Sequence, residues 1–178
     1  MRLGMILAAS SAALVAMAAP ASAQIAATPP AQAKAVLVRP LTLVKVDDLD
    51  FGTIISGPTA GTVTIDAVSG ARTTTGGATG VTGKDGGRAT FVGAGTASST
   101  IAVVSLVAPA ALTYTVVAGS TTTTYSIPVV NLTLDGAATR TISAGNAFNL
   151  GVGGTISLFA DQPEGLYSAT FDVTVDYQ

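Results

Sequence analysis

The segment from Tyr167 to Tyr177 alternates between apolar and polar residues without a break. A period of two over this length is typical of a β-strand that buries one face and exposes the other. A strand of this kind needs partner strands, so we expect an all-β domain that ends in one long strand from Gly165 to Tyr177. The face expected to point to the core carries Tyr167, Ala169, Phe171, Val173, Val175 and Tyr177.

Many short β-prone segments, separated by Gly, Pro and Asp, precede this strand, and no segment has convincing helical periodicity. The pattern predicts one immunoglobulin-like β-sandwich over residues 35–178. Asp135-Gly136 predicts a hairpin that joins residues 129–134 to 139–142, and the Gly- and Thr-rich residues 69–87 are expected to form a mobile loop with at most one weak strand. The other expected strands cover residues 35–38, 41–46, 51–55, 62–65, 88–92, 100–107, 112–117, 123–127, 147–152 and 155–159.

The N-terminus has the features of a signal peptide over residues 1–23. Arg2 is followed by an apolar stretch and by Ala21-Ser-Ala23, a small-residue cleavage site, so cleavage is expected before Gln24. Residues 24–34 contain two adjacent prolines and predict a flexible arm. We therefore expect export through the inner membrane to the periplasm and then the cell surface, with no stable membrane span.

The composition argues against catalysis, because the chain has no His and no Cys. Imidazole acid–base chemistry, thiol nucleophiles and the usual zinc sites are thereby excluded. The net charge of −2 comes without a basic cluster, which argues against a nucleic-acid partner. Asp47, Asp48 and Asp50 could bind calcium, but a solvated turn is the preferred interpretation. We expect no enzyme activity and no cofactor.

The end of the chain resembles the C-terminal signature of chaperone–usher pilus subunits. Gly165 is the fourteenth residue from the C-terminus, Tyr177 is the penultimate residue, and the alternating segment lies between them. This ending and the earlier motif Leu49-Asp-Phe-Gly52 together make the chain similar to a family of small, uncharacterised, secreted pilin-like proteins of Gram-negative bacteria. The absence of Cys is a departure, since many pilus subunits carry one disulfide within the domain.

The resemblance implies a fibre subunit that is a sandwich lacking its last strand. A periplasmic chaperone lends the missing strand, and at an outer-membrane usher the N-terminal arm of the next subunit replaces it, by β-augmentation. The residues that would contact chaperone or neighbouring subunit are Gly165, Tyr167, Ala169, Phe171, Val173, Val175 and Tyr177. Two alternatives remain open. One is a self-complete secreted sandwich in which residues 35–46 fill their own groove, and the other, less favoured, is a sugar-binding tip adhesin.

Overall fold

The computed structural model describes residues 30–96 and 101–178. The predicted signal peptide, its cleavage site at Ala21, Ala23 and Gln24, and the first part of the arm lie outside these residues. The chain divides into two units after Val36, which are described separately. In the first unit, residues 30–36 are exposed and have no regular secondary structure.

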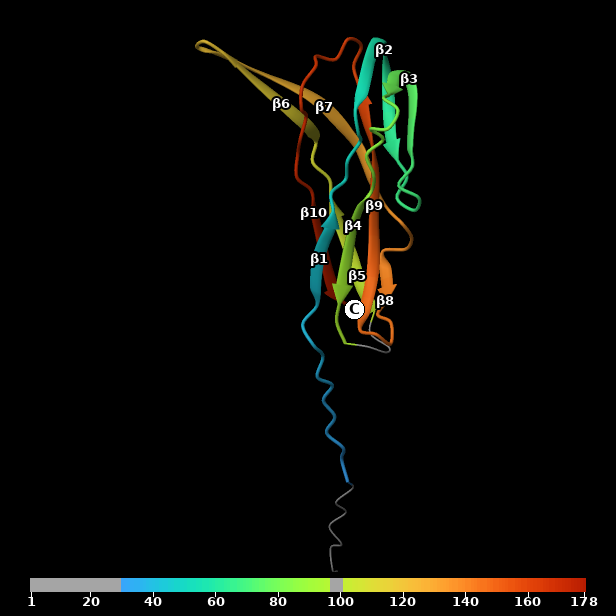
Figure 1. Ribbon diagram of the computed structural model, residues 1–178. Helices are drawn as coiled ribbons and strands as arrows, with labels where there is room; N and C mark the ends of the chain where they lie inside the picture. Colours follow the sequence, from blue (N-terminus) through green and yellow to red (C-terminus); the bar gives the residue numbers. More distant parts are fainter. Residues whose placement is uncertain (1–29, 97–100) are drawn as a thin grey trace, which may run out of the picture. The chain divides into compact units, whose positions relative to one another are not determined.

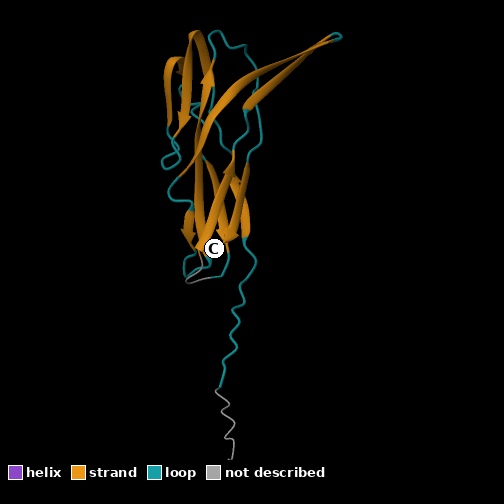
Figure 2. Ribbon diagram, turned by 180° about the vertical axis from the view of Figure 1, so that it is seen from behind, coloured by secondary structure: helices purple, strands orange, loops and turns teal. Residues whose placement is uncertain are grey.

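The second unit is all-β, and no helix occurs among its described residues, so no helix there could cross a membrane (Figures 1 and 2). Thr- and Val-rich segments, which suit a pleated and half-buried surface, form most of the strands. The strands are β1 (Thr42–Asp47), β2 (Ile54–Ile65), β3 (Arg72–Gly80), β4 (Ala89–Ala94), β5 (Ile101–Val107), β6 (Ala111–Ala118), β7 (Thr121–Leu134), β8 (Thr139–Thr141), β9 (Ala147–Leu158) and β10 (Asp172–Tyr177).

Two antiparallel sheets form a β-sandwich, which confirms the predicted fold class. The larger sheet has the order β1-β4-β9-β2-β3, with β7 also paired to β9 and β6 paired to β7. The smaller sheet has the order β10-β5-β8. Between them lies a core cluster to which β4 contributes Phe91, β9 contributes Leu150 and Val152, and β5 contributes Val104.

A second core cluster lies where the smaller sheet no longer covers the larger one. It joins Val63 and Ile65 of β2 to Ile156 and Leu158 of β9 and to Ile127 of β7. Beyond this cluster the β6–β7 hairpin extends away from the other strands of the unit (Figure 1). The residues nearest its tip, 115–118 and 121–124, pair only with each other.

The final strand expected from Gly165 to Tyr177 is wrong in its length. β10 covers only Asp172–Tyr177, and Ser168 makes one isolated bridge to Thr113 of β6. The strand begins at Asp172 because its partner ends there: Asp172 pairs with Val107, the last residue of β5. After Val107 the chain passes through Pro109, which has no N–H for a ladder, towards β6.

Residues 69–87 are not a loop with a weak strand, because they contain β3, nine residues long. β3 pairs with β2 on both sides of an irregularity between Ser56 and Gly61. The hydroxyls of Thr62 and Thr75 hydrogen-bond across this pair at 2.6 Å, and Ala78 is buried. Thr-rich sequence is therefore sufficient for a strand here, since a long partner strand is available.

The hairpin predicted around Asp135-Gly136 is also wrong. β8 follows this turn but pairs with β5 in the smaller sheet, whereas β7 pairs with β6 and β9. Asp135 instead forms an ion pair with Arg140, whose side chain is largely buried. The turn thus carries the chain from one sheet to the other.

Several predicted breaks are absent. The residues on either side of Pro128 form one strand, β7, and those on either side of Gly153-Gly154 form one strand, β9. Residues 35–38, expected to be β-prone, lie outside any strand.

Candidate strand-docking edge

β10 is hydrogen-bonded along one edge only, because β5 is its sole partner among the described strands. The amide of Gln178 donates to the carbonyl of Ile101 at 2.9 Å, which fixes the alternation of the ladder. Residues 172, 174, 176 and 178 therefore direct their backbone groups at β5. Val173, Val175 and Tyr177 direct theirs at the open edge, where the described residues offer no backbone partner.

β1 faces the same side of the sandwich and pairs with β4 alone. The two strands come together through side chains, since Leu43 of β1 and Leu41, the residue before it begins, pack with Val175 and Tyr177 of β10 against one core cluster. All four side chains are only half-buried, in contrast to Ile142 in the same cluster, which is 1% exposed. Between β1 and β10 the core is therefore incompletely covered, and we call this side of the sandwich the β1–β10 edge.

Tyr177 closes one end of the β1–β10 edge. Its hydroxyl donates to the carbonyl of Arg39 at 2.7 Å and accepts from the amide of Thr96 at 2.8 Å. These bonds connect the end of β10 to the segments that precede β1 and follow β4. A shallow, open hollow lies at this end, lined by Val38, Arg39, Pro40, Leu41, Val175, Asp176 and Tyr177.

Four of the residues predicted from the alternating segment lie together at this edge. Phe171, Val173, Val175 and Tyr177 are half-buried and pack against the core. The ring of Phe171 meets that of Phe91 edge-on, with centroids 6.3 Å apart.

The other three predicted residues lie elsewhere. Ala169 is exposed. A Cβ on Gly165 would overlap the ring of Tyr114 in β6, and the ring of Tyr167 lies 5.6 Å from the same ring. The Tyr167 hydroxyl donates to the carbonyl of Pro163 and accepts from the side-chain amide of Gln162. The Gly-x-Tyr pair thus packs the base of the β6–β7 hairpin and does not line the β1–β10 edge.

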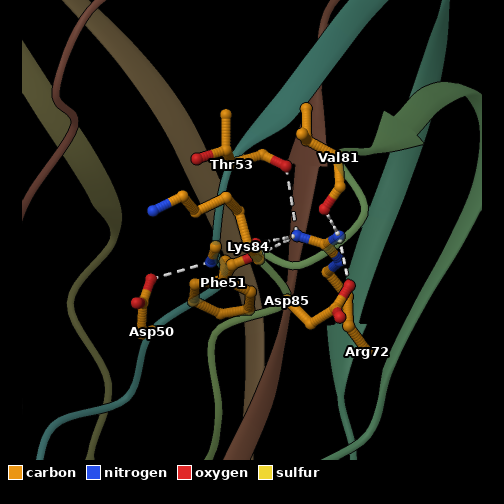
Figure 3. Close-up of polar contacts among 8 residues, drawn as sticks. Asp50, Phe51, Thr53, Arg72, Val81, Lys84 and Asp85 are labelled. Carbon is orange, nitrogen blue, oxygen red and sulfur yellow. Dashed lines mark hydrogen bonds and ion pairs between the residues drawn. The ribbon is translucent and has the colours of Figure 1, made fainter.

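Arg72, at the start of β3, is the main polar contact point of the larger sheet, and its side chain is only 5% exposed. Its guanidinium joins the start of β2 to the loop between β3 and β4 (Figure 3). The acceptors are the carbonyls of Phe51, Thr53, Val81 and Lys84 at 2.8–3.2 Å and the carboxylate of Asp85 at 2.7 Å.

The Leu49-Asp-Phe-Gly52 motif is shaped around this guanidinium. Gly52 has a φ of +74°, and a Cβ there would overlap both the Lys84 carbonyl and the Arg72 side chain. The Asp50 carboxylate accepts a hydrogen bond from the Gly52 amide at 2.7 Å. The backbone N–H and C=O of Asp50 are both hydrogen-bonded to the backbone of Gly87. The role of the motif in this structure is therefore to shape the binding site of the Arg72 guanidinium within the fold. Arg72 was not predicted from the sequence. Its one signal there is that it is a single basic residue directly before three threonines.

The three aspartates considered for calcium each have another role. Asp47 accepts from the Thr90 hydroxyl, Asp48 pairs with Lys45, and Asp50 caps Gly52. Within residues 30–96 and 101–178, no group of three or more acidic side chains is arranged to hold a metal ion.

Comparison with known proteins adds a family to this description. No curated protein and no solved structure gives a significant match. The model of a family described as a domain of unknown function, DUF4402, matches residues 41–177, from the residue before β1 to the last residue of β10. Because the match covers most of the chain and the whole sandwich, the protein belongs to the DUF4402 family.

Proposed function

We propose that the protein is exported and serves as a structural subunit of a surface fibre, in which a strand from another chain adds to the β1–β10 edge. One observation carries this proposal. β1 and β10 are both edge strands, they face the same side, and the apolar side chains between them are half-buried.

A donated strand would satisfy two needs at once. It would hydrogen-bond the outward backbone groups of Val173, Val175 and Tyr177, and it would cover the half-buried side chains of both strands. Left open, such an edge is a template for aggregation. This hazard is the physical reason for a periplasmic chaperone and an outer-membrane usher as partners, as the pilin resemblance implies.

The segment before β1 has the properties of a donor. Residues 30–40 form no strand, and Val36 and Leu37 are 88% and 89% exposed. Apolar, β-prone side chains held in solvent are costly unless another surface takes them up. We propose that residues 24–38 of one subunit supply the strand for the next.

Expression with and without a periplasmic chaperone of the chaperone–usher class, taken from the native host, tests this function. The wild-type chain alone should aggregate or be degraded in a periplasm, and with its chaperone it should be recovered as a one-to-one complex. Deleting residues 24–34, or replacing Val36 and Leu37 with Asp, should preserve that complex and abolish polymerisation. Replacing Lys34 with Asp is the matched control and should polymerise. A wild-type chain that is a stable, chaperone-independent monomer would contradict the fibre proposal.

One observation favours the second candidate, a self-complete secreted sandwich. The bond from Tyr177 to the Arg39 carbonyl holds the segment before β1 against the end of β10. If this contact completes the fold, Tyr177→Phe should lower the stability of a soluble monomer by about 1 kcal/mol, measured by urea unfolding. If no soluble monomer is recovered from wild-type or variant, the self-complete sandwich is wrong.

A further inference from the structure

The outer half of the β6–β7 hairpin leaves the edge of β6 open. Thr113 exchanges both backbone hydrogen bonds with Ser168 at 3.0 Å, so Thr113 directs its backbone groups away from β7. By the same alternation, the N–H and C=O groups of Thr115 and Val117 also point away from β7. No described strand pairs with them.

This open edge lacks the usual protection against pairing. Natural proteins shield edge strands with charges, prolines or bulges. No charged residue occurs from Val107 to Leu134, and the register of β6 on β7 is regular over all eight pairs. The edge strand β3 differs, because its pairing is irregular, and β8 has only three residues, one of them Arg140.

The side chains make β6 the apolar edge of the hairpin. Val117 is 69% exposed, and Val116 beside it is half-buried. Directly across the hairpin, Thr122 and Thr123 of β7 present hydroxyls. An apolar, uncharged edge meets an identical edge without electrostatic repulsion, and two identical strands related by a two-fold axis pair antiparallel.

We infer that the β6 edge is a contact between two copies of this chain, which pair β6 to β6 across a two-fold axis. Centred on Val116, this arrangement places Thr115 of each copy opposite Val117 of the other and forms four backbone hydrogen bonds. The contact is small and weak for an isolated pair of molecules. It uses none of the residues of the β1–β10 edge.

Single cysteines test the register, since the chain has no Cys of its own. In this arrangement the two Val116 residues form a non-hydrogen-bonded pair, with Cα atoms about 4.5 Å apart, a separation that a disulfide spans. Val116→Cys, exported to the oxidising periplasm of its native host, should give a disulfide-linked dimer on a non-reducing gel of whole cells. Thr123→Cys lies opposite Val116 on β7 and is the matched control, which should give several-fold less dimer.

A second substitution separates specific pairing from chance collision. Val117→Lys adds a charge to the edge at an exposed position, so it should leave the fold intact and reduce the Val116→Cys dimer to the level of the control. Equal dimer from both cysteines, or a dimer that persists with the lysine, would overturn the inference. The cross-link should survive deletion of residues 24–34, which abolishes polymerisation in the fibre proposal. A failure of the β6 pairing is therefore distinguishable from a failure of the fibre proposal.

Discussion

β9 and β10 are both core-facing strands of the sandwich, yet they differ in how completely the fold uses them. Ile156 of β9 pairs with Val63 of β2 and with Val129 of β7, so β9 has partners on both edges there. Ile156 is 1% exposed, whereas every core-facing residue of β10 is half-buried. The sandwich is closed around β9 and open beside β10, and this difference locates the candidate site.

Truncating one core residue in each strand tests this difference and has the largest expected effect. Ile156→Ala should lower the free energy of unfolding by about 3 kcal/mol, because it leaves a cavity in a closed core. Val175→Ala should lower it by only about 1 kcal/mol, since the side chain is partly solvated already. Urea unfolding of the chain refolded in vitro at low concentration, where aggregation is slow, measures both, with the exposed Thr174→Ala as the control. Equal losses at Ile156 and Val175 would remove the contrast.

Arg72 offers a test in the larger sheet, away from the β1–β10 edge. Arg72→Met would remove the donor of the Phe51 carbonyl and the ion pair with Asp85, whereas the carbonyls of Thr53, Val81 and Lys84 would each keep a backbone donor. It should lower the free energy of unfolding by about 2 kcal/mol. Lys84→Ala is the control, because Lys84 contributes its carbonyl and keeps it. The β1–β10 edge should be unaffected, so strand binding in the Arg72 variant should match the wild type. A loss of strand binding would show that the two regions are coupled.

The smallest expected effect concerns pH and the turn between β2 and β3. The amide and hydroxyl of Ser69, followed by the amide of Val68, donate to the Asp66 carboxylate and hold its pKa below the ordinary value of 3.8. A lowered pKa in the folded state stabilises the fold above the unfolded value, and this contribution is lost as the pH falls through the folded pKa. NMR titration of the Asp66 carboxyl carbon should give a midpoint below 3.8. A midpoint at or above that value would contradict the assigned hydrogen bonds.

Local pattern was enough to predict the all-β class and most strand positions, because alternation and β-propensity are properties of short segments. It predicted β9 as two short strands and β10 as one long strand, whereas β9 has 12 residues and β10 has 6. β9 contains Gly153 and Gly154, where a Cβ would overlap the carbonyl oxygens of Ile65 and Asn131. These glycines permit close approach of neighbouring strands and do not mark a loop.

The candidate site was predicted only in part, since its limits depend on distant segments. The length of β10 depends on where β5 ends, and the alternating sequence continues beyond that point to Tyr167. The partners of Gly165 and Tyr167 come from β6, and those of Arg72 from two separate loops. None of these contacts leaves a periodic signal in the sequence.

Amide hydrogen exchange along β10 tests the open edge most directly. In the chain refolded in vitro at low concentration without a donor, the amides of Thr174 and Asp176 should be protected by β5, and those of Val173 and Val175 should exchange rapidly. Extending the C-terminus with a short flexible linker and the sequence of residues 24–38 supplies a donor strand in the same molecule. The account predicts that this extension protects Val173 and Val175, whereas an extension carrying Asp at the positions of Val36 and Leu37 does not. Protection of Val173 and Val175 without any donor, or no change on adding one, would contradict it.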